Sequence, residues 1–410
     1  MKVFNNTGFL GSLSQLLSSS LKYLPIVHWG KNYNRHALLC DAVAAVIVTI
    51  MLIPQSLAYA LLASLPAQVG LYASILPLVL YAIFGTSKTL SVGPVAVASL
   101  MTASALSSIA EQGSADYLSA AIVLALLSGG FLLLLGVAKL GFLANFLSHP
   151  VVSGFITASA IVIALSQLKH ILGIPLQGDT LLELLRGIWL NVTDIHVVTL
   201  FLGVITIAFL LWAKKNVSPL LIKKGVSKHS ALILSKLAPV LAIIGSIVIV
   251  YAFHLEQHAV AVVGDIPRGL PNLSFPVITF ELVQALLVPA ILISIIGYVE
   301  SVSVGKTLAV KRREKIDVDQ EFVALGAANI GSAFSGGFPV TGGFSRSVVN
   351  FDAGAVTQAA SIYTAVDIGV ASLLLTPVLF YLPKATLAAT IIVAVISLVD
   401  FSMLKKTWQF

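Results

Sequence analysis

Residues 336–346 read Gly-Gly-Phe-Pro-Val-Thr-Gly-Gly-Phe-Ser-Arg, and residues 91–96 read Ser-Val-Gly-Pro-Val-Ala. Each segment interrupts a long apolar stretch with Gly and Pro, and each then leads into a short helical pattern. Gly permits an irregular backbone, and Pro suits the start of a helix. We therefore expect an extended piece followed by a half-length helix in both places, beginning near Pro94 and near Pro339. Ordinary Pro kinks are the alternative.

The chain around these segments is unusually apolar. Of its 410 residues, 58% are hydrophobic and 10% are charged, whereas soluble domains carry roughly 25% charged residues. A soluble fold could not bury so much apolar surface, and lipid is the alternative solvent. In lipid every backbone amide has to be satisfied within its own segment, which favours helices. The sequence therefore predicts an all-α polytopic integral membrane protein.

Charge-free runs place about twelve membrane spans along the chain. No charged residue lies between Asp41 and Lys88, which leaves room for two crossings. Between the spans we expect a polar link over 172–194 and an extracellular or periplasmic loop over 256–279. The expected spans are 40–61, 68–85, 93–109, 117–138, 149–171, 195–213, 235–254, 280–304, 317–333, 341–354, 357–380 and 384–400.

The two interrupted segments occupy matching places. One opens the third span, and the other opens the third span counted from the eighth. Paired broken helices in corresponding positions indicate an inverted-repeat transporter. The count gives a seven-plus-seven arrangement, with a first repeat over 38–255 and a second repeat over 280–404 in which five spans are present.

Positive charge is concentrated beside the spans. Six lysines lie between Lys214 and Lys236, and a second basic cluster covers 306–315. This is the positive-inside pattern of cytoplasmic loops, so the net charge of +7 does not indicate a nucleic-acid partner. We expect 1–37 and 405–410 to be cytoplasmic, the protein to lie in the plasma (inner) membrane, and the lysines to contact anionic membrane lipid.

Two half-helix N-termini that face one cavity would create a positive site. Their free amides donate hydrogen bonds, and each helix dipole contributes about half a positive charge. Arg346, in the first turn of the second half-helix, adds a full charge. An arginine at mid-membrane costs roughly 2.5–3.5 kcal/mol even on insertion scales, and a bound anion would offset part of that cost. This positive electrostatic field predicts a small inorganic or organic anion as substrate.

Glu300 is the other buried charge, and it lies near the far end of the eighth predicted span. A buried carboxylate close to a cation can take up and release a proton. The hypothesis is proton-coupled anion symport with Glu300 as the proton carrier; a structural pair between Arg346 and Glu300 is the alternative. Asp367, in the eleventh span, is a weaker candidate because residues 363–369 can reach the membrane interface.

Gln55 and Tyr59 share one face of the first span because they are one helical turn apart. They are candidates for lining the site. Gln55 could instead hydrogen bond between helices, and Tyr59 could be a packing residue.

At these residues the chain resembles the SulP family of anion transporters, also called sulfate permeases. The resemblance covers nearly all of 38–404. The matching text is Ile53-Pro54-Gln55-Ser56-Leu57-Ala58-Tyr59-Ala60 within 41–60, then residues 70–74, 85–87, 91–96, 338–350 and 382–400.

The resemblance implies a core domain and a gate domain, with an anion held between the third and tenth helices. It implies alternating access by an elevator-like movement of the core against the gate. Glu300 matches the acidic position linked to proton coupling in some members. By position, the implied anion-binding residues are Gln55, Tyr59, Pro94, Val95, Ala96, Phe344, Ser345 and Arg346.

The sequence departs from the family pattern in two places. Members normally continue with two more spans and a cytoplasmic STAS domain, whereas this sequence ends at Phe410. We therefore expect a truncated chain with an incomplete gate and no STAS domain, and a homodimer in the full-length form. Asp367 is the second departure, because it falls in a helix that is typically uncharged.

Other functions remain open from the sequence. A nucleobase permease of the same architecture has a neutral or weakly acidic substrate, so Arg346 would be unnecessary there. An uncoupled anion channel would show much faster flux. No Ser/His/Asp constellation, metal-ligand spacing or nucleotide loop indicates an enzyme, a metal or a cofactor. Sulfate, bicarbonate, chloride, dicarboxylates, and proton or sodium as the coupling ion, all remain possible.

Overall fold

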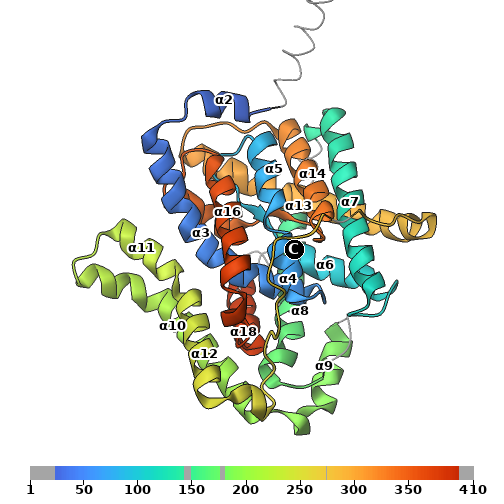
Figure 1. Cartoon of the computed structure of the whole chain (residues 1–410), viewed down its shortest axis with the longest axis vertical. Coiled ribbons are helices and arrows are strands. Elements are labelled where there is room, and N and C mark those ends of the chain that lie inside the picture. The colour runs from blue at the N-terminus through green and yellow to red at the C-terminus, as the bar shows by residue number, and fades with distance from the viewer. Residues whose placement is uncertain (1–23, 143–148, 176–180, 274, 397–410) are drawn as a thin grey trace, which may run out of the picture.

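The computed structural model describes residues 24–142, 149–175, 181–273 and 275–396. The predicted cytoplasmic end 405–410, the tail of the last predicted span and second repeat (397–404), and residues 1–23 lie outside these ranges. The described chain is built from helices and one short ribbon (Figure 1). Its elements are α2 (Ile26–Lys31), α3 (Arg35–Leu62), α4 (Ala67–Tyr72), α5 (Leu76–Phe84), β1 (Val92–Gly93), α6 (Ala96–Ser107), α7 (Ala115–Val137), α8 (His149–Leu172), α9 (Leu181–Leu190), η2 (Val192–Asp194), α10 (Val197–Lys223), α11 (Lys228–Lys236), α12 (Ala238–Phe253), η3 (Leu255–His258), α13 (Phe280–Lys311), α14 (Val318–Phe334), β2 (Thr341–Gly342), α15 (Phe344–Asp352), α16 (Ala359–Leu374), α17 (Thr376–Leu379) and α18 (Lys384–Ile396).

Within the described residues, each predicted span overlaps a helix, a helix pair or a strand followed by a helix. In the described ranges α3, α4–α5, α7, α10 and α13 are long and apolar enough to cross a membrane, and α11–α12 make a sixth candidate bent by 42°. The other predicted spans correspond to shorter helices, among them α6, α16 and α18. The predicted polar link contains the helix α9. The predicted external loop pairs with the first residue of α18, where Lys384 N donates a hydrogen bond to Ala261 O (2.9 Å).

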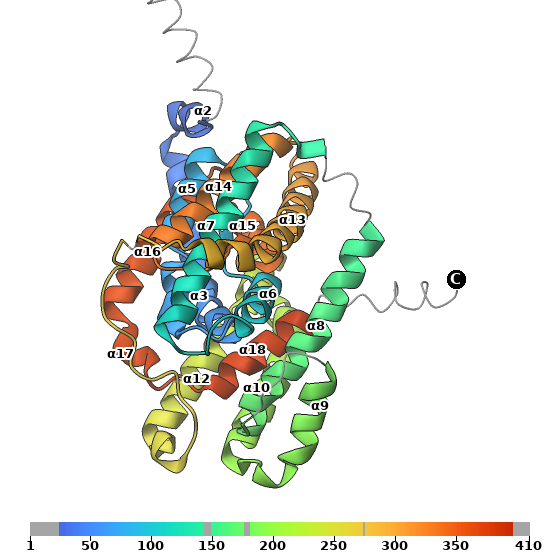
Figure 2. The same ribbon diagram turned by 90° about the vertical axis from the view of Figure 1, so that its right-hand side faces the viewer.

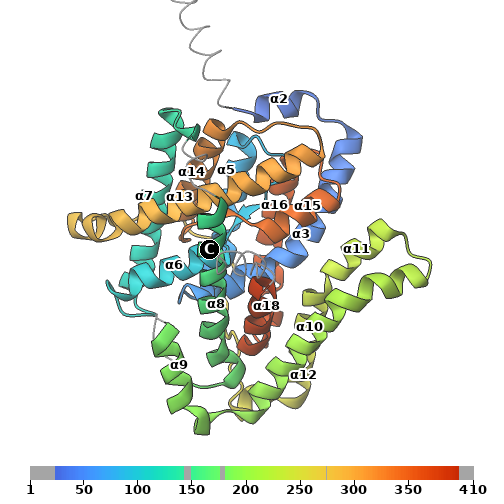
Figure 3. The ribbon, with the colours of Figure 1, turned by 180° about the vertical axis from the view of Figure 1, so that it is seen from behind.

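The helices form two packed units. In the core, α14 packs against α5 and α7, α13 against α7, and α16 against α3. In the gate, α18 packs against α8, α10 and α12, and it also contacts α3 of the core. Figure 1 shows the core above and the gate below, and Figures 2 and 3 show the same division from the side and from behind. In Figures 1 and 3, α10 and α11 project from the body. The core and gate of the predicted fold are therefore present.

Close packing in the core depends on glycines, which have no side chain. A Cβ atom on Gly129 of α7 would lie 2.8 Å from the carbonyl oxygen of Gly326, and one on Gly326 of α14 would lie 2.9 Å from the oxygen of Gly129. Membrane helices lack a hydrophobic drive to associate and gain instead from close backbone contact at small residues. This pair of glycines lets α7 and α14 approach each other.

The two interrupted segments meet in an antiparallel ribbon. Val92 pairs with Gly342 and Gly93 pairs with Thr341, which joins β1 to β2. Ser301 Oγ accepts a hydrogen bond from Gly342 N (2.8 Å), and Ser347 Oγ accepts one from Ser91 N (3.0 Å). These bonds satisfy backbone groups that would otherwise be unpaired in an apolar interior. The expected extended pieces are confirmed, and each leads into a short helix.

The helix starts differ from the prediction at Pro339. α6 begins at Ala96, two residues after Pro94, whereas α15 begins at Phe344, after the strand that follows Pro339. The ribbon pairing keeps residues 341–342 extended, so the second helix cannot begin at its proline. The end of the ribbon, and not the proline, determines where α15 starts.

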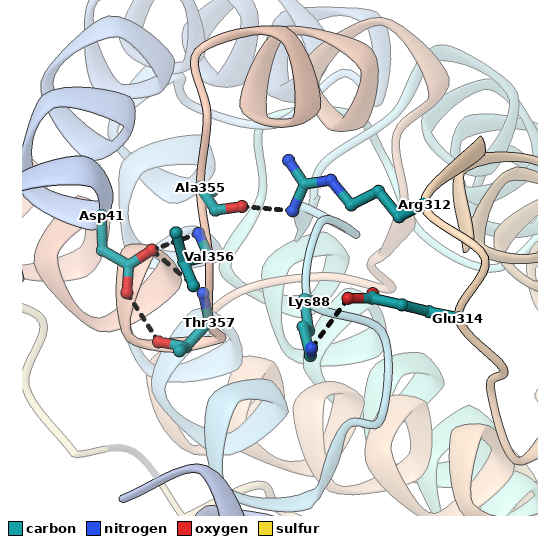
Figure 4. A network of polar contacts seen from close by, with 7 residues as sticks. All are labelled: Asp41, Lys88, Arg312, Glu314, Ala355, Val356 and Thr357. Carbon is teal, nitrogen blue, oxygen red and sulfur yellow. Dashed lines mark hydrogen bonds and ion pairs between the residues drawn. The ribbon is translucent and has the colours of Figure 1, made fainter. Parts of the chain in front are cut away.

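Polar contacts tie the ends of the core helices together (Figure 4). Asp41, which we expected near the start of the first span, lies inside α3 and is fully buried. Its carboxylate accepts hydrogen bonds from the backbone and hydroxyl of Thr357 (3.0 and 2.6 Å). Arg312 donates to the carbonyl oxygen of Ala355, and Lys88 pairs with Glu314 at 2.8 Å. The loop before α16 is thereby fixed to α3 and α13.

Candidate functional site

A cavity of about 280 Å³, the central cavity, lies where the two short helices meet the gate. The side chains come from α3, α6, α13 and α15 of the core and from α11 and α18 of the gate. The cavity is lined by Gln55, Tyr59, Val95, Ala96, Val97, Lys236, Glu300, Gly343, Phe344, Ser345, Arg346, Val348, Ala394 and Val395.

Arg346 is the central charged group of this cavity. It lies in the first turn of α15 and is 2% exposed. Its Nη1 donates hydrogen bonds to Pro94 O (2.8 Å) and Gln55 Oε1 (3.4 Å). Its Nε and Nη2 are buried and have no hydrogen-bond partner among the residues described. Buried donors without partners are costly, and a bound oxyanion could accept from both because a guanidinium presents them as a fork.

Two glycines make room for the guanidinium. A Cβ atom on Gly343 would lie 2.8 Å from both Cζ and Nη2 of Arg346, and one on Gly93 would lie 3.4 Å from Nη2. The guanidinium therefore lies against the ribbon that links the two interrupted segments. The N-cap residues Val95 and Gly343 provide no side-chain hydrogen bond to their helices. The first-turn amides of α6 and α15 consequently add to the positive field of the guanidinium.

Glu300 lines the same cavity from α13. It is not near the far end of its helix as expected, because α13 continues to Lys311. No ion pair within 4.0 Å joins Arg346 and Glu300 in the described part of the chain, so the two groups do not form a direct structural pair in this conformation. Glu300 is therefore a second ionisable group at the cavity, separate from the hydrogen bonds of Arg346.

The predicted site residues come together with one difference. Gln55 and Tyr59 line the cavity from α3, Val95 and Ala96 line it from the start of α6, and residues 344–346 line it from α15. Pro94 does not line it; its carbonyl oxygen instead holds Arg346. Asp367 is also absent from the lining and accepts a hydrogen bond from Thr49 Oγ1 (3.4 Å), between α16 and α3. The roles of the predicted site residues in anion binding remain predictions.

Sequence reasoning missed the gate side of the cavity. Lys236 and Ala394 line it, yet Lys236 reads in the sequence as one of six topogenic lysines. A second cavity of about 350 Å³ shares Gln55, Tyr59 and Lys236 with the first and extends to Lys214 on α10. The position of Lys236 directly before the apolar run of α12 was the available signal.

Comparison with known proteins agrees with this arrangement. Residues 38–410 match the model of the Sulfate permease family. The chain is 38% identical over 388 residues to "Probable sulfate transporter 4.2" of Arabidopsis thaliana, covering 94% of this chain and 56% of that protein. It is 34% identical to "High affinity sulfate transporter 1" of Stylosanthes hamata, covering 96% and 59%. The chain thus spans somewhat more than half the length of these relatives.

Solved structures show the same fold. The structure of SLC26A9 matches with a TM-score of 0.85 and 25% identity, covering 95% of this chain and 62% of that one. The transmembrane domain of a cyanobacterial bicarbonate transporter, BicA, matches with a TM-score of 0.79 and 21% identity, covering 91% and 92%. Fold and family agree: the chain is an integral, multi-pass membrane protein that belongs to the sulfate permease family.

Proposed function

We propose that this chain moves a small anion across a membrane by alternating access, with the anion held at Arg346 between the starts of α6 and α15. The observation that carries the proposal is the pair of buried, unpartnered nitrogens, Nε and Nη2, of Arg346 beside the cavity. A neutral nucleobase would leave the charge of the guanidinium uncompensated. An oxyanion would provide both the acceptors and the opposite charge.

The substrate proposed first is sulfate, with bicarbonate next. Two relatives of this chain carry sulfate transport in their names, and one structural neighbour is called a bicarbonate transporter. Both anions present several oxygen acceptors, which suits a guanidinium and the free amides at two helix starts. Chloride can use the same positive field, but it is a single atom and has no two separate oxygens to accept the forked pair of hydrogen bonds that the guanidinium donates.

The proposed movement is that of the core against the gate, and the proposed coupling group is Glu300. The second cavity extends from the central cavity to Lys214, which belongs to the lysine cluster 214–236. This supports a pathway for the anion toward the lysine-rich face of the protein. Glu300 and Arg346 line one cavity, so a proton on Glu300 would change the charge that an entering anion meets. Sodium is the alternative coupling ion.

The proposed topology places the lysine-rich face in the cytoplasm with the N-terminal segment 1–37, in the plasma (inner) membrane. It assigns 38–255 and 280–404 to the two repeats and 256–279 to the external side. We propose a homodimer for the full-length protein. The topology is tested by labelling single-cysteine variants in intact cells with an impermeant maleimide. Arg268→Cys should react from outside, and Lys224→Cys should not.

The test of transport uses the full-length protein in proteoliposomes. Uptake of labelled sulfate, bicarbonate, chloride and a dicarboxylate is measured with and without an imposed proton gradient, with empty liposomes as the control. We expect sulfate or bicarbonate uptake that saturates and responds to the gradient. Uptake of a nucleobase but of no anion would contradict the proposal. Fast flux that does not saturate or couple would instead indicate a channel.

A further inference from the structure

A salt bridge joins the gate to the core beside the cavity. Nζ of Lys236, the last residue of α11, pairs with Oδ2 of Asp352, the last residue of α15. α11 packs on α10 of the gate, whereas α15 packs on α3 and α13 of the core. The two side chains are only 22% and 20% exposed. The pair is therefore partly shielded from water and salt, which strengthens it relative to a surface pair.

The location of this pair distinguishes it from the other ion pairs within the described ranges. Lys88 and Glu314 both belong to the core, and His254 pairs with Glu256 two residues away. Only the Lys236–Asp352 pair crosses between the two units in this part of the chain. Lys236 also lines both the central cavity and the second cavity that extends toward Lys214.

We propose that the Lys236–Asp352 pair is a latch that stabilises the conformation in which the central cavity opens toward Lys214, and that it breaks when the core moves against the gate. The proposal rests on the function proposed above, because that function requires the two units to move. Coulomb attraction falls with separation, so the pair stabilises the conformation in which it is formed over one in which it is not. A contact made in one state shifts the population toward that state.

Direct binding of the anion by Lys236 is the competing interpretation. The two interpretations predict different effects when Lys236 or Asp352 is removed. If the pair is a latch, loss of either partner depopulates the same open state. If Lys236 is instead an anion ligand, Asp352 competes with the anion for it. Loss of Lys236 would then weaken anion binding, and loss of Asp352 would strengthen it.

The experiment measures how often the cavity is open. Ala394 lines both cavities from α18, and Cys40 is the one cysteine among these 410 residues. In full-length protein carrying Cys40→Ser and Ala394→Cys, an impermeant maleimide is added to the lysine-rich face of sealed vesicles. We expect Lys236→Gln and Asp352→Asn each to slow labelling, by about fivefold. The exchange Lys236→Asp with Asp352→Lys should return the rate toward that of the parent.

The matched control is the pair within the core, Lys88 with Glu314 (Figure 4). Lys88→Gln and Glu314→Gln should leave the labelling rate unchanged, because both residues move with the core. Lys236→Arg keeps the charge and should retain most of the parent rate, and size-exclusion profiles check that each variant is folded. Unchanged labelling in both Lys236→Gln and Asp352→Asn overturns the latch, as does a change of opposite sign in the two variants.

Labelling requires no substrate, which separates this proposal from the proposed function. A parent protein that transports no anion yet shows the expected labelling pattern contradicts the function and leaves the latch standing. Normal anion uptake with labelling that is indifferent to the latch variants contradicts the latch alone.

Discussion

Nη1 of Arg346 donates a hydrogen bond to the carbonyl oxygen of Pro94 over 2.8 Å. The two residues are 252 positions apart in the sequence, and each stands at the start of one of the two short helices. This bond, together with the longer one from Nη1 to Gln55 Oε1 (3.4 Å), holds the guanidinium between the helix starts, while Nε and Nη2 have no partner in the residues described. The cavity chemistry therefore depends on contact between the two interrupted segments.

Replacement of Arg346 by Gln should nearly abolish anion uptake. The charge and the donor fork are both lost, and hydrogen bonds to charged groups contribute about 1.5–3 kcal/mol each, which corresponds to a tenfold or larger loss of affinity. Arg346→Lys should retain part of the affinity, because the charge stays and the fork does not. Saturation of uptake in proteoliposomes measures both. Arg268→Gln, in the exposed loop, is the control and should behave as the parent. Full activity of Arg346→Gln would contradict the assignment.

Gly343→Ala should weaken anion binding without removing any charged group. The φ of Gly343 is −83°, which alanine adopts without strain, so the methyl group acts only through its contact with Arg346. That methyl would lie 2.8 Å from Cζ and has to displace the guanidinium. We expect KM for the anion to rise by about fivefold, since a shift of several tenths of an ångström disturbs two hydrogen bonds.

The control for this substitution is Gly130→Ala. A Cβ atom on Gly130 meets nothing within 4 Å, and the residue lies inside α7. Alanine should leave uptake unchanged and stabilise the helix by about 0.5–1 kcal/mol. Equal effects of the two substitutions on KM would show that the guanidinium contact is not responsible.

Glu321→Gln should destabilise the core. Glu321 is fully buried, and its carboxylate accepts hydrogen bonds from Tyr81 Oη (2.9 Å), Thr86 N (2.8 Å), Thr86 Oγ1 (2.6 Å) and Ser87 N (3.1 Å). An amide nitrogen would face donors where an oxygen now accepts, at a cost of about 2–4 kcal/mol. The melting temperature in detergent should fall clearly.

Glu314→Gln provides the comparison for that measurement. Its carboxylate pairs with Lys88 at a partly exposed position, with the side chains of Glu314 and Lys88 32% and 40% exposed. Such pairs contribute about 1 kcal/mol or less, so its melting temperature should change little. If the two glutamine variants melt alike, the buried bonds of Glu321 do not stabilise the core as we expect.

Glu300→Gln should uncouple uptake from the proton gradient. The amide cannot take up or release a proton, so uptake should no longer rise when the outside is acidified. Glu281, in the first turn of the same helix and exposed, is the matched control. Glu281→Gln should keep the pH dependence of the parent, which is read from initial uptake rates at several external pH values. An unchanged pH profile in Glu300→Gln would exclude it as the proton carrier.

The class of the protein and the order of its helices could be predicted from the sequence. Charge-free runs mark the spans because an unpaired charge in lipid is costly, and no tertiary knowledge is needed to find them. The interrupted segments were likewise visible, since Gly and Pro break helical patterns locally. The residues on the core side of the cavity, such as Gln55 and Arg346, could be named because they lie in or beside recognisable motifs.

The remaining features depend on contacts between distant segments. The pairing of Gly93 with Thr341 sets the start of α15, and this long-range pairing overrides the local preference of Pro339 for a helix start. The pairing of Lys236 with Asp352 was not predictable, because a lysine in a basic cluster has the same local pattern whether it faces water or a cavity.

By itself, the sequence determined that this chain is a membrane protein with an inverted-repeat helical transporter fold. It also determined that one arginine lies beside an interrupted helix. Both could be predicted because hydropathy and helix-breaking residues act locally. Only the tertiary structure decided that Arg346 would be held by the carbonyl of Pro94, that two of its donors would remain unpartnered among the residues described, and that Glu300 would line the same cavity without pairing to it. These relationships arise where the two short helices contact the gate. That contact brings together segments that are far apart in the sequence, so it cannot be read from any one of them.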